Sequence, residues 1–131
     1  EEKLKNLGKD EIISKAIHFC GPCYDESIIS NLIHSSICTV SPGNIGLTVI
    51  NSFSYGIPAI THNNFENQMP EVEAIVENET GFLFNENNIK SLEKKMLKVI
   101  NSKINFKVEC RKVIDNNYNP KNQVEILKAI L

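Results

Sequence analysis

The sequence lacks the long apolar run, the basic tract and the secretion signal that would place it in several common protein classes. Its apolar runs are only a few residues long, far short of the roughly 20 that span a bilayer. Lys and Arg total 14 against 16 Asp and Glu, which disfavours a general nucleic-acid or anionic-membrane binder. The opening segment, EEKLKNLGKDE, is charged throughout and shows no signal peptide, which favours a cytoplasmic location.

Tryptophan is absent, and cysteine occurs only four times. Cys20 and Cys23 enclose CGPC, a motif typical of thioredoxin-like oxidoreductases, in which a helix start lowers a thiol pKa. Phe19 stands where such proteins usually have Trp, and after GIPAIT they continue with an antiparallel hairpin that this sequence does not indicate. Cys20 and Cys23 therefore have two possible interpretations: they are two small residues at a ligand-binding turn, or they form a reactive dithiol. No second ligand pair accompanies the two cysteines, so no metal site is expected.

Length and hydrophobic pattern predict one α/β domain. The 131 residues suffice for one core and are too few for two. Strands are expected at 15–19, 36–41, 57–62 and 81–84. Helices are expected at 25–36, 44–55, 69–76, 87–102, 105–118 and 120–131, and EEKLKNLG reads as the end of an earlier helix. In the helix at 87–102 the residues expected to face the core are Ile89, Leu92, Met96, Val99 and Ile100. This alternation predicts a Rossmann-like parallel sheet flanked by helices.

Ligands of open parallel sheets bind at the carboxyl ends of the strands. The segments expected there are CGPCYDE, SPGNIGLT, THNNFENQMPE and NENN. Within them, His62 ends the third predicted strand and would face the cleft, with a structural role as the alternative. We therefore expect the functional residues in these four segments.

The segment SPGNIGLT indicates an anion site at the start of a helix. Free N–H groups near Gly46, Leu47 and Thr48 would bind a phosphate, helped by the dipole of the helix. Asn44, Thr48, Asn51 and Tyr55 follow one another at spacings that place them on one polar stripe. A plain solvent-exposed face is the alternative interpretation of this stripe.

Several short motifs occur in a characteristic order. They are FCGPCYDE, Gly46-Leu47 at a helix start, YGIPAIT, Pro70-Glu71 and TGFLF. In this order they resemble the donor-binding half of retaining glycosyltransferases with two Rossmann-like domains, the GT-B architecture. The resemblance covers residues 15–100. It implies that residues 1–131 are a single, truncated C-terminal domain that binds a nucleotide sugar, without the N-terminal acceptor domain and therefore inactive alone.

The resemblance implies transfer of a sugar from a UDP- or GDP-sugar to a glycan or lipid-linked acceptor, as in polysaccharide biosynthesis. It further implies retention of configuration, independence of metals and other cofactors, and no nucleic-acid partner. The enzyme would be cytoplasmic, with membrane association of the full-length protein as an open alternative. The catalytic residues, the sugar, the base and the oligomeric state stay unassigned.

The resemblance also implies roles for individual residues. The turn at Pro22 and Cys23 would contact the base. Two glutamates that hold the sugar and the ribose in most relatives fall on Gly43 and Asn51, neither of which is acidic. Glu71 would contact the ligand, with a solvated surface carboxylate as the alternative. The full set of expected donor-binding residues is Pro22, Cys23, Gly43, Asn44, Ile45, Gly46, Leu47, Thr48, Asn51 and Glu71.

Overall fold

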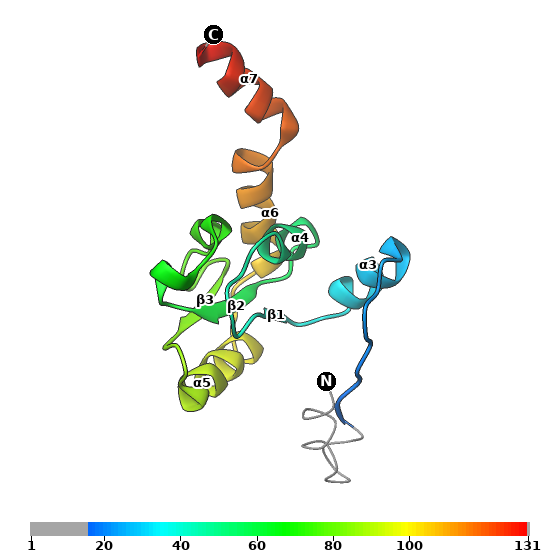
Figure 1. The fold of residues 1–131 in the computed structure, drawn as a ribbon, viewed down its shortest axis with the longest axis vertical. Helices are drawn as coiled ribbons and strands as arrows, with labels where there is room; N and C mark the ends of the chain where they lie inside the picture. The colour runs from blue at the N-terminus through cyan, green and yellow to red at the C-terminus, as the bar shows by residue number, and fades with distance from the viewer. Residues whose placement is uncertain (1–15, 131) are drawn as a thin grey trace.

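A parallel sheet of three strands forms the centre of the computed structural model, which describes residues 16–130 (Figure 1). The strands are β1 (Thr39–Val40), β2 (Ala59–His62) and β3 (Gly81–Phe84), hydrogen-bonded in the order β1-β2-β3. In the register, Ala59 lies opposite Thr39 on one side and Gly81 on the other. The Rossmann-like α/β fold predicted from the alternation of elements is therefore confirmed.

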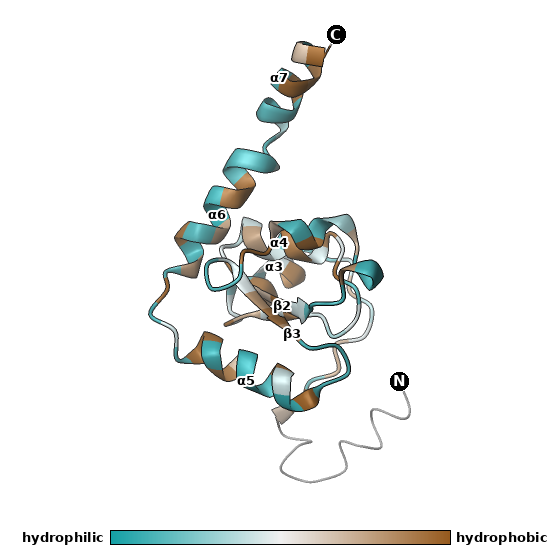
Figure 2. Cartoon of the chain, turned by 90° about the vertical axis from the view of Figure 1, so that its left-hand side faces the viewer, coloured by the Kyte–Doolittle hydropathy of each residue, from teal (hydrophilic) through white to brown (hydrophobic). Residues whose placement is uncertain are grey.

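Helices cover both faces of the sheet (Figure 2). α4 (Thr48–Ser54) and α6 (Phe106–Asn117) pack on one face, and α5 (Ile89–Ile100) packs on the other. The first face buries Ile45, Val49, Phe53, Ala59, Val72, Ala74, Ile75 and Cys110; the second buries Ile60, Phe82, Phe84 and Val99. A helix as short as α4 is not stable alone, so its position depends on this packing.

The outer elements are more exposed. α3 (Glu26–His34) begins at the predicted cap Asp25, whose Oδ1 accepts the N–H groups of Ser27 at 2.8 Å and Ile28 at 3.2 Å. The pKa of Asp25 is lowered most by the hydrogen bond from the Ser27 hydroxyl and less by the hydrogen bonds from these two amides. Two short 3₁₀ helices, η1 (Phe65–Asn67) and η2 (Pro70–Ala74), follow β2, and α7 (Pro120–Ile130) projects away from the sheet (Figure 1). Among residues 16–130, no helix combines the length and the apolar character that a membrane crossing requires.

Several predicted boundaries were wrong. The helix expected from residue 44 begins at Thr48, because residues 44–47 form a turn held by the Gln68 side chain of another loop. The strand expected at 36–41 keeps only two residues. The helix at 69–76 is the 3₁₀ helix η2. Residues 16–19 form no strand, since none of the described strands pairs with them. The helix end expected in EEKLKNLG lies outside the described residues.

The core-facing side of α5 was predicted only in part. Val99 is buried and Leu92 is partly buried, as expected. Ile89, Met96 and Ile100 are exposed instead. The reason is that α5 packs along one narrow stripe on β3, which leaves the flanks of its apolar face uncovered.

We predict that Gly81→Ala destabilises the fold, because an added Cβ would overlap the carbonyl oxygen of Ala59. Moving β3 away from β2 to relieve this overlap should cost about 1–3 kcal/mol, measured by urea unfolding. Gly43→Ala is the matched control, since a Cβ there meets no atom within 4 Å. If the two variants are equally stable, β2 and β3 are farther apart at Gly81 than in this structure.

Candidate functional site

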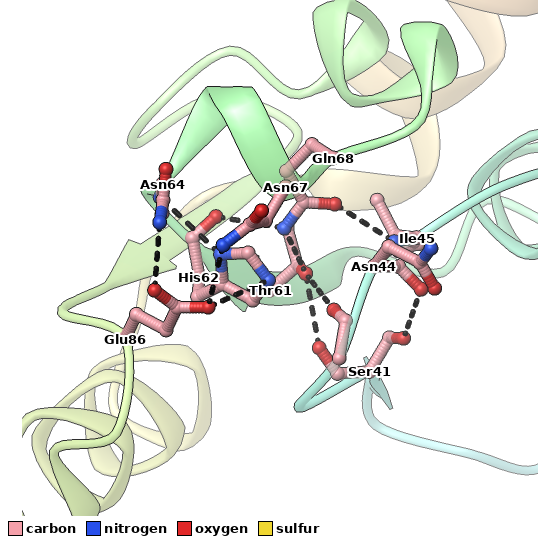
Figure 3. Close-up of polar contacts among 10 residues, drawn as sticks. Ser41, Asn44, Ile45, Thr61, His62, Asn64, Asn67, Gln68 and Glu86 are labelled. Atoms are coloured by element: carbon pink, nitrogen blue, oxygen red, sulfur yellow. Dashed lines mark hydrogen bonds and ion pairs between the residues drawn. The ribbon is translucent and has the colours of Figure 1, made fainter.

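Three loops meet at the carboxyl ends of the strands. Residues 41–46 follow β1, residues 63–68 follow β2, and residues 85–88 follow β3. Figure 3 shows side chains of all three loops in one polar network. The segments SPGNIGLT, THNNFENQMPE and NENN thus lie together, as predicted. The fourth segment, CGPCYDE, leads into α3 and ends at its first residue, and no hydrogen bond between described residues joins it to the network.

Gln68 connects the loop after β2 to the turn after β1 (Figure 3). Its Oε1 accepts the N–H of Ile45 at 2.8 Å, and its Nε2 donates to Thr61 Oγ1 and to the His62 carbonyl oxygen, both at 3.0 Å. These partners fix the orientation of the amide, because the Ile45 N–H needs an acceptor and the His62 carbonyl needs a donor. Gln68 therefore holds Ile45 at a defined place beside β2.

Hydroxyl groups hold the rest of this turn. Thr61 Oγ1 lies 2.9 Å from the Ser41 carbonyl oxygen and 3.0 Å from that of Gly43, and its single proton can be donated to either. Ser41 Oγ donates to the carbonyl oxygen of Asn44 at 3.1 Å. These hydroxyl groups hold the turn from inside the protein, through the Asn44 carbonyl oxygen and through either the Ser41 or the Gly43 carbonyl oxygen.

The amides of Gly46, Leu47 and Thr48 have no hydrogen-bond acceptor within residues 16–130. Leu47 is the N-cap residue of α4, and no side chain caps the helix. The carbonyl groups of Gly46 and Leu47 are engaged, because they accept the N–H groups of Val49 and Asn51. We call the three free amides the amide row; such a row of donors at a helix start favours an anion.

His62 and Glu86 form a second polar group, at the ends of β2 and β3. The His62 side chain is 2% exposed, and its Nδ1 accepts the backbone N–H of Asn64 at 3.2 Å. The Glu86 carboxylate accepts a 2.7 Å hydrogen bond from Asn64 Nδ2, which lowers the pKa of Glu86. Partial desolvation opposes this effect, while Asn67 and His62 lower the same pKa further.

The predicted site residues fall in three places. Residues 43–48 lie in the single turn that carries the amide row. Asn51, one turn along α4, lines an open hollow of about 290 Å³ between α3 and α4 with Glu26, Ile29, Ile33 and Tyr55. Pro22 and Cys23 precede α3 and are not among the residues that line this hollow.

Glu71 lies apart from the amide row, in η2. Burial raises the pKa of the Tyr118 hydroxyl, and the nearby carboxylates of Glu73 and Glu71 add to the effect. Between described residues, no hydrogen bond links Glu71 to residues 43–48. Met69, two residues before Glu71, lies close to the turn, with its Cγ 3.8 Å from the place of a Gly46 Cβ.

The residues that organise the site, Gln68, Thr61, Asn64 and Glu86, were not predicted individually. The only signal was that they belong to the polar segments at the carboxyl ends of the strands. Gln68 and Ile45 are 23 positions apart in the sequence, and Asn64 and Glu86 are 22 positions apart. The periodic patterns of helices and strands extend over a few residues, so they do not indicate contacts between residues more than 20 positions apart.

A family model described as Glycosyl transferases group 1 matches residues 1–125. The chain belongs to this family. As a group 1 glycosyl transferase it is expected to be of the GT-B type, which agrees with the motifs and with the parallel sheet flanked by helices. No curated protein and no protein of solved structure was found to match it.

The glycosyl transferase family and the fold give no support to the dithiol alternative. A thioredoxin would need an antiparallel hairpin after GIPAIT, whereas β2 and β3 are parallel. Cys20 and Cys23 are free thiols in the segment before α3. Between residues 16 and 130, no group of three or more His, Cys, Asp or Glu is placed to hold a metal ion.

We predict that Gln68→Met loosens the turn of this glycosyl transferase, because Ile45 N–H loses its acceptor. The cost should be about 1–3 kcal/mol in the free energy of unfolding, with faster hydrogen exchange of the Ile45 amide by NMR. Gln68→Glu keeps an acceptor for Ile45 and should retain more protection. Glu66→Gln, in the exposed η1 of the same loop, is the control. Unchanged exchange in Gln68→Met would remove the role given to this side chain.

We predict that the thiols react according to burial. Burial raises the pKa of Cys110 to about 12, with a further contribution from Glu109, so Cys110 should react with iodoacetamide only after unfolding. The exposed Cys20 should be modified in the native chain at neutral pH, as read by mass spectrometry. Insulin reduction with dithiothreitol should stay at the uncatalysed rate. Turnover that depends on Cys20 would bring back the dithiol alternative.

Proposed function

We propose that this chain is the donor-binding domain of a retaining glycosyltransferase. It would bind a nucleoside-diphosphate sugar, UDP- or GDP-linked, whose sugar passes to a glycan or lipid-linked acceptor held by a different domain. Membership of the family supports a sugar donor and an acceptor in general. The single observation that carries the finer proposal is the amide row of Gly46, Leu47 and Thr48.

In this proposal the diphosphate lies on the amide row. As the bond between the sugar and the diphosphate breaks, negative charge grows on the leaving phosphate. Hydrogen bonds to a charged group are stronger than those between neutral groups, and donors fixed in advance need no rearrangement during the reaction. The dipole of α4 adds to this stabilisation. The proposed transfer is therefore independent of a metal ion.

The nucleoside would extend from the amide row into the hollow between α3 and α4. Asn51 and Glu26 both line that hollow, and they offer an amide and a carboxylate to the ribose hydroxyl groups. The resemblance expects a carboxylate at position 51, where this chain has Asn51. Glu26 supplies a carboxylate in the same hollow. Because α3 begins three residues after Cys23, the base would lie at the turn of Pro22 and Cys23.

The sugar would start near Gly43. A Cβ added at Gly43 meets no atom within 4 Å, so the space above this residue is open. No side chain there can take the role of the missing glutamate, and contacts to the sugar must come from a neighbouring loop. Glu71 stays a proposed contact, since Met69, two residues earlier, lies next to Gly46.

We predict that Leu47→Pro weakens binding of UDP or GDP without unfolding the chain. Leu47 has φ −54°, which proline adopts, and its N–H has no acceptor among the described residues. Loss of one hydrogen bond to a charged phosphate should lower affinity by about tenfold to a hundredfold in calorimetric titrations with UDP, GDP and ADP.

Leu47→Ala is the matched control, because it keeps the amide and removes only a side chain that is 67% exposed. It should bind as the wild type does. If the alanine and proline variants lose affinity equally, the amide row is not the phosphate site. If the folded wild type shows no response to any of the three nucleotides at millimolar concentration, the proposed function itself is wrong.

A further inference from the structure

The ring of His62 has one nitrogen without a hydrogen-bond acceptor. Its Nδ1 receives the N–H of Asn64, so the proton of the neutral ring is on Nε2. Nε2 lies 3.9 Å from Glu86 Oε1, which is too long for a hydrogen bond. Within residues 16–130, no other acceptor is assigned to it. A donor on a side chain that is 98% covered thus points toward Glu86.

Glu86 has spare acceptor capacity on the same side. Its Oε2 is engaged by Asn64 Nδ2 at 2.7 Å, while Oε1 receives only a long 3.4 Å contact from Asn67 Nδ2. The hydrogen bond from Asn64 lowers the pKa of Glu86, so the carboxylate is ionised at neutral pH. The Glu86 side chain is 32% exposed, so Oε1 can be approached from solvent.

A donor and an acceptor that face each other across this gap select one kind of chemical group. The group must accept from His62 and donate to Glu86, which a hydroxyl group or a water molecule does. An oxygen about 2.8 Å from both atoms would lie beside the line that joins them. Because the His62 ring is buried and Glu86 is partly exposed, this place is open to solvent from the side of the Glu86 carboxylate.

A hollow lies next to the pair at the carboxyl ends of the strands, although neither His62 nor Glu86 lines it. An open hollow of about 290 Å³ is lined by Pro42, Phe84, Asn87, Asn88, Ile89 and Leu92. Phe84 meets His62 edge-on, with ring centroids 6.4 Å apart, and Asn87 directly follows Glu86. Pro42 belongs to the turn after β1 that leads to the amide row. The hollow therefore lies between the turn of the proposed phosphate site and the loop of Glu86.

We propose that His62 and Glu86 form a binding site for a hydroxyl group of a hexose. This inference rests on the proposed function, because it supplies the sugar contact that Gly43 cannot make. Neighbouring strands lie about 4.8 Å apart, so the ends of β2 and β3 are roughly 5 and 10 Å from the end of β1. The turn that carries the amide row leaves β1 at this end of the sheet, so a hexose attached to a diphosphate on the row would lie at the same end as the pair. A hexose of the acceptor is the other source of the same hydroxyl chemistry.

The test follows the ring nitrogens of His62 by NMR in the complete chain. The probes are UDP-glucose, UDP-N-acetylglucosamine and GDP-mannose, compared with UDP and GDP, and then free glucose, galactose and mannose. We expect ligands that carry a sugar to shift the Nε2 resonance of His62, whereas UDP and GDP leave it unchanged. The exposed His18 and His34 provide internal controls, whose resonances should be the same with a nucleotide sugar as with its nucleotide alone.

Substitutions of Glu86 test whether the sugar-dependent response of His62 depends on this carboxylate. Glu86→Ala should weaken the sugar-dependent response by about tenfold or more, the size of a lost hydrogen bond to a charged group, with nucleotide affinity unchanged. Glu86→Gln, which keeps an acceptor and loses the charge, should fall in between and serves if the alanine variant does not fold. Glu79→Gln, an exposed carboxylate in the turn before β3, is the matched control.

The outcomes separate this inference from the proposed function. A response to nucleotide sugars identifies the donor as the source of the hydroxyl group, and a response to free hexoses alone supports the site while it contradicts donor binding. Nucleotide binding without any change at His62 overturns the inference and leaves the function intact, with water as the occupant of the gap. A sugar response that persists in Glu86→Ala also overturns it.

Discussion

The hydrogen bond from the Ile45 amide to Gln68 is the contact on which the candidate site depends. It joins the loop after β2 to the turn after β1, and the other two bonds of the same side chain anchor it to β2 itself. A buried amide needs a partner, and Gln68 supplies it from outside the turn. The chain therefore leaves β1 in a fixed path, and the next three amides stay free for a ligand.

The same contact links the site to the core. Ile45 is fully buried together with Val49 and Phe53 of α4, so the turn is held by packing on one side and by Gln68 on the other. α4 has only seven residues and no side-chain cap. Its start is positioned by these tertiary contacts, since its own hydrogen bonds are too few to define it. A change that loosens the packing of the core should therefore also displace the amide row.

Two departures from the family resemblance change how this domain would hold a ligand. Gly43 and Asn51 stand where the resemblance expects carboxylates, yet carboxylates occur close to both ends of the proposed site. Glu26 lines the hollow that also contains Asn51, and Glu86 faces His62 beyond the amide row. In the proposed function, acidic contacts would thus come from α3 and from the loop after β3 instead of from α4.

Local sequence by itself determined much of the fold. β3 coincides with GFLF, α3 begins after Asp25, and a new helix begins at Pro120, because caps, proline and apolar period act over a few residues. The tertiary structure alone decided where α4 begins and which polar side chains meet. Those outcomes depend on Gln68 reaching Ile45 and Asn64 reaching Glu86, each across more than 20 positions. Such pairs form only after the strands have aligned, so no local pattern in the chain encodes them.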